Sequence, residues 1–590
     1  MILLVNPPFV SLGRPNLGLS LLKGQLLRDG HECRILYADH RLAALVGVDD
    51  YSWVHRDYEA LTGEWLFSGF VRPSRQWDLG YLELQVRRNY KPRELDLLRA
   101  ALDLLPAYLE EVCAEILAQN PTVVGCSSTF QQNNAALAIL RLLKEKRPQL
   151  VTLMGGANLE GALAEPMENF PWVDYVVSGE GEGCISRLYE LACQYGARIP
   201  HELLPPEVGC RGRAPGRGKI QEMDELAYPD FRECFEGLAS YPQLAGVKPS
   251  LTLEGSRGCW WGQVKHCTFC GLNGSGMNYR AKSAPRLLAE IRELTSRYDT
   301  QFVEMVDNII APKHLKDLLP ALAELDLRFF WEVKANLKGS HFELLRQAGV
   351  HWVQPGIESF SDHVLELMRK GQRAIQNIFV LKAARENGIR LSWNLLLRHP
   401  GERTEDLVAQ RDLAHSLMHL QPPQACCEVR PDRFSPLFAE SQNLEPFEVY
   451  SYIYELPPEE IRKIAYLYAL PPDGRPAEYD ERYQALERKV EAWKNAWQFA
   501  ERRSLHVIEG KVWDGRWPGQ EHCYHLSADE HEILAACPSP TRLAEIEERL
   551  GAPVLAECLP RLLDLRLCYR DETHLLSLVL KAPAEQLPAY

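Results

Sequence analysis

The stretch LTLEGSRGCWWGQVKHCTFCGLNG, residues 251–274, runs from a short apolar strand directly into a loop with three cysteines. Cys259, Cys267 and Cys270 are spaced Cys–x7–Cys–x2–Cys, and glycine recurs through the loop. A cubane cluster needs several thiolates that converge from a loop able to wrap it, and glycine permits the backbone angles involved. Three thiolates leave one iron open to a chelating amino and carboxylate group. The spacing predicts a [4Fe–4S] cluster.

A structural zinc site is the alternative, because zinc also favours Cys–x2–Cys. Zinc sites usually pair two such knuckles, or one knuckle with two histidines, and no second knuckle follows here. His266 adjoins Cys267 and cannot easily point at the same metal. Cys426 and Cys427 are consecutive, so in a strand at most one can point inward, and we interpret them as packing residues.

Strand and helix patterns alternate on both sides of this loop. Residues 1–205 predict a doubly wound parallel sheet, which binds ligands at the carboxyl ends of its strands. Residues 249–445 predict a partial parallel barrel of six βα units, with its chemistry at the same strand ends. The fold class is therefore α/β. The barrel strands are expected at 249–255, 301–306, 329–335, 351–357, 390–397 and 424–430.

Two other regions carry no catalytic motif. Residues 206–248 are rich in proline and glycine and are expected to be a linker. Residues 446–590 predict a helical C-terminal region, whose end at 522–582 has the outline of a winged helix, three helices and then a strand pair. Those helices lack the basic stripe that DNA phosphates require, so peptide binding at the sheet edge or simple packing on the barrel fits better.

Composition narrows the class of protein. The chain has 590 residues and a formal net charge of −14, which argues against a nucleic-acid surface spread over the whole chain. No stretch of ~18 apolar residues predicts a membrane span. The start MILLVNPPFV is interpreted as a buried strand, not a signal peptide. Most of the 16 cysteines lie singly in apolar segments, so a reducing cytoplasm is expected instead of a disulfide scaffold.

The barrel pattern, the cysteines after its first strand and Phe269 before the last cysteine resemble radical SAM enzymes, whose usual spacing is Cys–x3–Cys–x2–Cys. The longer spacing resembles the cobalamin-dependent radical SAM proteins of ribosomal-peptide (RiPP) maturation, as do GEWLF (63–67), GIES (356–359) and DRFSP (432–436). The resemblance covers nearly the whole chain. It implies three cofactors: a [4Fe–4S] cluster, S-adenosylmethionine (SAM) and cobalamin.

The resemblance implies SAM contacts from polar groups at the barrel strand ends. Asp307 and Asn308 stand where the superfamily contacts the methionyl amine, and Glu332 and Glu358 are candidates for the ribose or the substrate. The alternative is that these carboxylates lie at the rim of the barrel and contact only solvent. Alternation places Glu332 and Lys334 on one strand face. The full SAM set is Phe269, Asp307, Asn308, Glu332, Glu358 and Asn394.

Cobalamin would meet the strand-end loops of the first domain, where small residues let a flat macrocycle approach the backbone. Neither G-x-G-x-x-G nor a Walker A motif is present, which disfavours NAD and ATP. The D-x-H-x-x-G signature is also absent, so no histidine on cobalt is expected, and the lower face would meet the 127–132 loop. The candidate contacts are Ser127, Ser128, Thr129, Gln131, Gly155, Gly156, Asn158, Gly179 and Glu180.

An aromatic-rich insertion at about 45–95 is interpreted as a satellite hydrophobic cluster, with a lid over the substrate as the alternative. The resemblance implies a C-methyltransferase that modifies an unactivated carbon of a ribosomally made precursor peptide, with electrons from a flavodoxin- or ferredoxin-type donor. Cyclisation, epimerisation or rearrangement with the same cofactors is one alternative, and a zinc-stabilised winged-helix regulator without enzymatic activity is the other. Neither nucleic acid nor a membrane is an expected partner, and no catalytic base is identified.

Overall fold

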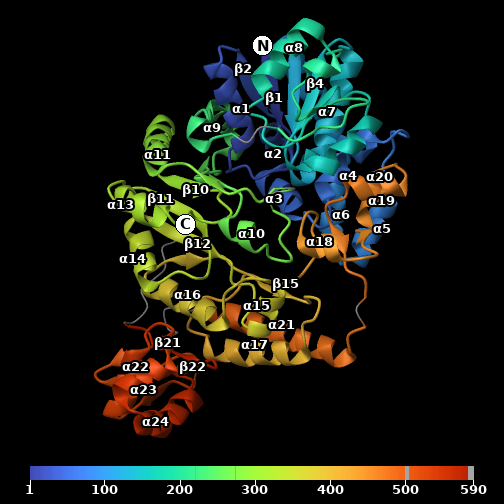
Figure 1. The fold of residues 1–590 in the computed structure, drawn as a ribbon. Helices are drawn as coiled ribbons and strands as arrows, with labels where there is room; N and C mark the ends of the chain where they lie inside the picture. Colours follow the sequence, from blue (N-terminus) through green and yellow to red (C-terminus); the bar gives the residue numbers. More distant parts are fainter. Residues whose placement is uncertain are drawn as a thin grey trace.

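The computed structural model describes residues 1–218, 221–272, 274, 276–472, 474–498, 504–517 and 519–581. Asn273 of the cysteine loop and residue 582, the expected end of the winged helix, lie outside the described residues. Figure 1 shows the N-terminal sheet domain at the top, the barrel below it and a small C-terminal unit at the bottom. In the described parts, no helix is long and apolar enough to cross a membrane.

The N-terminal domain is the predicted doubly wound sheet, with strand order β2-β1-β3-β4-β5-β6. Its parallel strands are β1 (Ile2–Asn6), β2 (Cys33–Tyr37), β3 (Val123–Ser127), β4 (Val151–Gly155) and β5 (Tyr175–Val177). The antiparallel edge strand β6 (Val208–Gly209) lies inside the expected linker. The linker therefore starts later than predicted, because a two-residue strand gives too weak a sequence pattern to detect.

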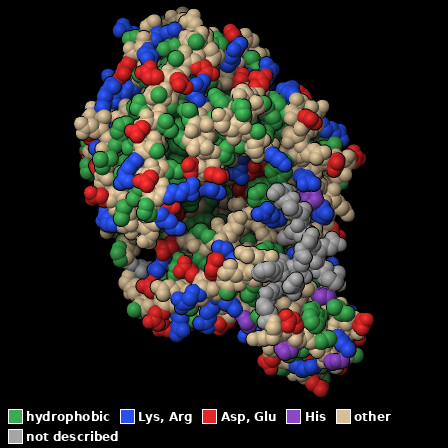
Figure 2. All heavy atoms as spheres, turned by 180° about the vertical axis from the view of Figure 1, so that it is seen from behind, with side chains coloured by type: hydrophobic (Ala, Val, Ile, Leu, Met, Phe, Trp, Pro, Cys, Tyr) green, Lys and Arg blue, Asp and Glu red, His purple; other side chains and the backbone are tan. Residues whose placement is uncertain are grey.

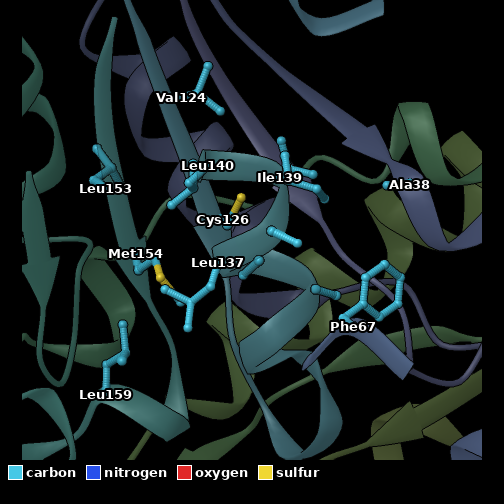
Figure 3. Close-up of a cluster of buried hydrophobic side chains, with 14 of the residues drawn as sticks. Ala38, Phe67, Val124, Cys126, Leu137, Ile139, Leu140, Leu153, Met154 and Leu159 are labelled. Carbon is cyan, nitrogen blue, oxygen red and sulfur yellow. The ribbon is translucent and has the colours of Figure 1, made fainter. Parts of the chain in front are cut away.

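Helix α7 (Asn133–Lys146) covers one face of this sheet. Figure 3 shows Leu137 and Leu140 of α7 beside Cys126 of β3 and Met154 of β4. All four side chains are buried. Burying one large aliphatic side chain contributes about 1.5–3 kcal/mol, so this layer fixes the position at which β3 and β4 end.

The insertion folds into helices that pack on the same domain. They include α3 (Val48–Arg56), α4 (Thr62–Val71), α5 (Gly80–Arg87) and the start of α6 (Pro92–Ala118). Trp65 and Tyr81 are fully buried and stack with their ring centroids 4.5 Å apart. Trp65 and Tyr81 thus have the packing role of the first interpretation, but they belong to the main hydrophobic core of the domain and form no separate satellite cluster.

The barrel has strands at all six predicted positions. Five form one parallel sheet: β7 (Leu251–Leu253), β10 (Phe302–Met305), β11 (Arg328–Val333), β12 (Val350–Pro355) and β13 (Arg390–Leu391). The fifth predicted strand is interrupted after Leu391, and its second part, β14 (Leu395–Leu397), pairs with β15 (Cys426–Glu428). A single parallel bridge from Glu358 to Leu395 connects the two ladders. Helices α11 (Ala284–Tyr298), α14 (Gly339–Gln347), α16 (Ala374–Glu386) and α17 (Thr404–Ser416) follow barrel strands.

The C-terminal region is only partly helical. Its helices include α19 (Val449–Ile453), α20 (Pro458–Ile464) and α21 (Ala477–Trp497). A three-stranded antiparallel meander follows them, which departs from the predicted helical pattern. Its strands are β18 (Leu505–Ile508), β19 (Lys511–Asp514) and β20 (His522–Tyr524). The winged-helix outline itself is confirmed. It consists of α22 (Ala528–Ala536), α23 (Leu543–Leu550), α24 (Ala552–Asp564) and a sheet of β21 (Thr541–Arg542), β22 (Cys568–Arg570) and β23 (His574–Ser577).

Candidate functional site

The cysteine loop is fixed to the barrel by the residues that lengthen its spacing. Trp260 and Trp261 begin the short helix α10 (Trp260–Val264), which lies near the centre of the molecule in Figure 1. The Trp260 indole donates to the carbonyl of Ile310 (3.2 Å) and the Trp261 indole to that of Arg369 (3.3 Å). Gly258 precedes the helix and has φ +78°. A Cβ there would lie 2.4 Å from the Asn278 carbonyl oxygen, so glycine is required at this position.

The three cysteine side chains are half-buried and lie within electrostatic reach of one another. Burial, together with negative charge on Cys267 and Cys259, raises the pKa of Cys270 to about 12. Burial also raises the pKa of Cys267, which Lys370 and Lys334 oppose. No three His, Cys, Asp or Glu side chains in the described residues are grouped as ligands of a metal ion.

Asp307 forms hydrogen bonds with the chain where the cysteine loop begins. It is fully buried, and its Oδ1 accepts the backbone N–H groups of Gly255 and Ser256, both at 2.6 Å. Its Oδ2 accepts the indole N–H of Trp331 at 2.8 Å. Burial raises the pKa of Asp307 to about 7, against the opposing effect of these donors. Asp307 therefore supports the start of the cysteine loop, and its contact with the SAM amine stays a prediction.

Two of the predicted carboxylates lie together at the ends of neighbouring strands. Burial, then the charges of Glu358 and Asp307, raises the pKa of Glu332 to about 7. Glu358 stands at φ +61°, a strained conformation typical of functional sites, and its Oε1 accepts from Lys370 Nζ at 3.2 Å. Half-buried Asn308 follows β10, and the Asn394 side chain accepts the Ala425 N–H at 3.1 Å. Phe269 packs beside Met368 and Leu437.

The predicted cobalamin contacts lie at the carboxyl ends of β3, β4 and β5, but most of their side chains bind other protein groups. Ser127 Oγ accepts from Asn16, Ser128 Oγ pairs with Asn133 and Asn158, and Thr129 Oγ1 donates to Gln132. Gln131 bridges the backbones of Gly63 and Val54. Glu180 pairs with Arg257 and Arg280 of the barrel. These side chains therefore support the strand-end loops, and the polar contacts expected from them to cobalamin stay predictions.

The glycines in the same loops bring backbones close together. Gly155 ends β4, and Gly156 stands at φ +111°, where a Cβ would lie 2.5 Å from the Ser128 carbonyl oxygen. Gly179 follows β5 at φ +84° with open space around its Cα. The β4 loop thus lies directly on the β3 loop, and the two present one continuous edge.

A cavity of about 220 Å³ separates this edge from the cysteine loop. Phe130, which is 71% exposed at φ +46°, lies on the sheet side, and Leu272 lies on the cysteine-loop side. The residues that close it come from the insertion, for which a lid was the alternative, and from the segment after the last barrel strand, which sequence reasoning missed except for Phe434 of DRFSP. They are Tyr58, Leu61, Glu64, Phe434, Tyr450, Tyr454, Ile464, Tyr466 and Leu467.

Glu64 links this cavity to the insertion. Its carboxylate accepts the backbone N–H groups of Asn133 (2.6 Å) and Asn134 (2.8 Å) at the start of α7. Negative charge there is favourable, because the first N–H groups of a helix lack partners within it. The GEWLF motif was the available sequence signal. It contains the glutamate that holds the insertion against the strand-end loops.

Substitution of Gly371 is expected to loosen the cysteine loop. Gly371 stands at φ +61°, and a Cβ there would lie 2.2 Å from the Trp261 ring. Gly371→Ala should destabilise the fold by about 1–3 kcal/mol through overpacking and backbone strain, measured by urea unfolding. Gly246→Ala is the matched control, because its Cβ meets nothing within 4 Å. Equal stability of both variants would contradict this account of the loop.

Comparison with known proteins agrees with this geometry. Residues 253–414 match the model of the Radical SAM superfamily. An uncharacterised methyltransferase, PH0819 of Pyrococcus horikoshii, is 25% identical over 347 residues, which cover 58% of this chain and 72% of that protein. The anaerobic magnesium-protoporphyrin IX monomethyl ester cyclase of Rubrivivax gelatinosus is 23% identical over 366 residues, 59% of this chain and 63% of the cyclase.

Two solved structures share the fold over most of the chain. The cobalamin-dependent SAM radical enzyme OxsB, with aqua-cobalamin bound, has a TM-score of 0.55 at 14% identity, and the match covers 85% of this chain and 72% of OxsB. The radical SAM methyltransferase TsrM of Kitasatospora setae, with cobalamin and a [4Fe–4S] cluster bound, has a TM-score of 0.53 at 16% identity, covering 82% and 90%. Residues 253–414, the cysteine loop and most of the barrel, are therefore a radical SAM domain, which makes the chain an enzyme of the kind that uses a [4Fe–4S] cluster and SAM.

Proposed function

We propose that the protein is a cobalamin-dependent radical SAM methyltransferase that modifies an unactivated carbon of a ribosomally made precursor peptide. One observation carries the proposal: the cysteine loop and the strand-end loops of a doubly wound domain face each other across one cavity. Two cofactors bound on opposite sides of that space would act on one substrate between them. The fold shared with OxsB and TsrM, whose structures hold cobalamin, supports the same assignment.

The types of residue around the cavity suit the binding of a corrinoid. Glycines and an exposed Phe130 border it, and a flat, largely apolar macrocycle needs such an edge. The cavity is smaller than the ~300–1,000 Å³ of ordinary ligand sites, so binding requires it to open. Phe130 and Leu272 are exposed apolar side chains on its two sides, and we expect them to move apart.

On the barrel side, Cys259, Cys267 and Cys270 would hold the cluster, and Glu332, Glu358, Asn308 and Asn394 are the candidates to orient SAM. Bound together, the cluster and SAM supply a radical able to remove hydrogen from a carbon without an acidic proton, and cobalamin supplies a methyl group. The residues of the protein itself hold the loops of the site in position. Asp307 holds the cysteine loop at Gly255 and Ser256, and Glu64 holds the loop that borders the cavity.

The C-terminal unit is the proposed site for the leader of the peptide substrate. Within the described residues, β22 pairs with β23 alone and β20 with β19 alone, so each has one edge without a strand partner. An extended peptide can add to such an edge through backbone hydrogen bonds. A flavodoxin- or ferredoxin-type donor would supply electrons, and a reducing cytoplasm would suit both donor and cluster.

The test is anaerobic reconstitution with iron, sulfide and hydroxocobalamin, followed by reaction with methyl-deuterated SAM and a precursor peptide encoded beside the gene. The expected result is stoichiometric cobalt, S-adenosylhomocysteine and a product heavier by one labelled methyl group. Protein reconstituted without cobalamin is the control and should give no methylated product. A modified product without the label would contradict methyl transfer and favour cyclisation, epimerisation or rearrangement.

A further inference from the structure

Two lysines lie beside the cysteine loop with their side chains buried. Lys334 directly follows β11, and Lys370 lies in the loop after α15 (Asp362–Leu367). They are only 6% and 7% exposed. Lysine is almost never buried to this extent unless it is paired with an opposite charge.

Among the described residues, both hydrogen-bond acceptors of Lys334 are neutral. Its Nζ donates to the carbonyl oxygen of Lys370 and to Gln372 Oε1 at 3.2 Å. Gln372 is held in place by its own Nε2, which donates to Gly356 O (2.6 Å) and Asn377 Oδ1 (2.8 Å). Across the described residues, no carboxylate forms an ion pair with Lys334, although the side chain is buried. The described hydrogen-bond partners therefore leave the charge of Lys334 unbalanced.

Both ammonium groups lie against rings of the cysteine loop. Lys334 Nζ is 4.0 Å from the ring centroid of Trp261, and Lys370 Nζ is 5.7 Å from that of Phe269. Trp261 lies between Cys259 and Cys267, and Phe269 directly precedes Cys270. The rings favour a cation at their faces and exclude water, so the two charges are fixed beside the cysteines in a weakly polarisable environment.

Lys370 differs from Lys334 because it has a carboxylate partner. Its Nζ lies 3.2 Å from Glu358 Oε1, so part of its charge is already balanced. The pair of lysines thus brings two positive charges and one negative charge to the cysteines, and the net charge is positive. Cys267 lies within electrostatic reach of both lysines, so a thiolate there, together with whatever it binds, can balance this charge.

We propose that Lys334 and Lys370 are the counter-charges of the iron–sulfur cluster and stabilise its reduced form. This inference rests on the assignment of Cys259, Cys267 and Cys270 as cluster ligands. Reduction takes one electron from an external one-electron donor, makes and breaks no bond, and adds one negative charge within the space that the cysteines enclose. Two fixed cations favour that added charge, so the cluster is easier to reduce with them than without them.

The experiment measures the midpoint potential of the reconstituted full-length protein without SAM, by a dye-mediated titration followed with EPR. For Lys334→Met we expect the ratio of reduced to oxidised cluster at a fixed potential to fall at least tenfold, which is about 59 mV for a one-electron couple. Lys334→Arg should restore most of the loss. Lys370→Met should shift the potential in the same direction, because Glu358 then lacks its partner.

Lys382→Met is the matched control. Lys382 is also a buried lysine that donates to carbonyl oxygens, those of Pro538 and Ser577, and it lies against the C-terminal unit instead of the cysteine loop. Its replacement should leave the midpoint potential unchanged. A Lys334→Met protein with full iron content and the wild-type midpoint would overturn the proposal, and if that variant holds no cluster, an unchanged midpoint in Lys370→Met would do so.

The affinity for SAM distinguishes the proposed counter-charge role of the lysines from a role in binding SAM. A buried lysine could instead pair with the carboxylate of SAM, so the affinity of the oxidised protein for SAM is measured for each variant by equilibrium dialysis. A tenfold or greater loss of SAM affinity in Lys334→Met without a shift in potential would overturn the proposal in favour of that pairing. Failure of the wild-type protein to hold any cluster would count against the proposed function itself, and it would be visible before any variant is made.

Discussion

Replacing Cys267 with serine is expected to remove the iron–sulfur cluster. Serine has no thiolate to offer, and only three cysteines are available in the loop, so the loss of one leaves too few ligands. After anaerobic reconstitution, iron content and the visible iron–sulfur absorption should fall to background. Cleavage of SAM to 5′-deoxyadenosine should also stop, while the urea unfolding midpoint of protein that was never reconstituted should stay close to wild type.

Cys427→Ser is the matched control for this experiment. Cys427 is half-buried like Cys267, and it lies on β15, where Leu396 is its strand partner. Its neighbour Cys426 packs against the hydrophobic core of the barrel, so the consecutive cysteines are not placed as a pair of ligands. The control variant should keep its full iron content. Retention of iron by Cys267→Ser, or its loss from Cys427→Ser, would contradict the ligand assignment.

The sequence predicted the parts of the fold that have a repeating pattern. Alternating strands and helices gave the doubly wound sheet and the six barrel strands, since burial on both faces produces clear apolar runs. The two-residue strand β6 and the meander of β18, β19 and β20 are short, so their patterns could not be told from loop or frayed helix. The interruption between β13 and β14 also has no apolar signature of its own.

The candidate site was predicted less completely than the fold. The cysteines were identified because their spacing is local in the sequence, whereas the partners of Asp307 and Glu180 are set by contacts between distant segments. Asp307 binds backbone amides 51 and 52 residues away, and Glu180 pairs with Arg280, 100 residues away. Backbone donors leave no trace in residue type, so residue types alone could not show that Asp307 supports a loop.

The largest effect on stability is expected from Arg257→Leu. The Arg257 guanidinium pairs with Glu254 (2.7 Å), with Glu182 and with Glu180 (3.1 Å), and so joins the cysteine loop to the N-terminal domain. The side chains of Arg257, Glu254 and Glu182 are at most 17% exposed. Removing one partner of a buried ion pair leaves the others uncompensated and costs about 3–5 kcal/mol. Urea unfolding measures the loss.

A control variant and the pH dependence both test whether the loss of charge pairing causes the loss of stability in Arg257→Leu. Arg87→Leu removes an exposed pair with Glu448, whose side chains are 64% and 53% exposed, and should cost no more than about 1 kcal/mol. Burial alone would raise the pKa of Glu254, but Arg257 outweighs it and holds that pKa below its ordinary 4.5. A carboxyl with a lowered pKa in the folded state stabilises the protein above its unfolded pKa, and the effect is lost as pH falls. The difference between wild type and Arg257→Leu should therefore shrink below about pH 4.5, and a difference independent of pH would show that packing, not charge, holds the two domains together.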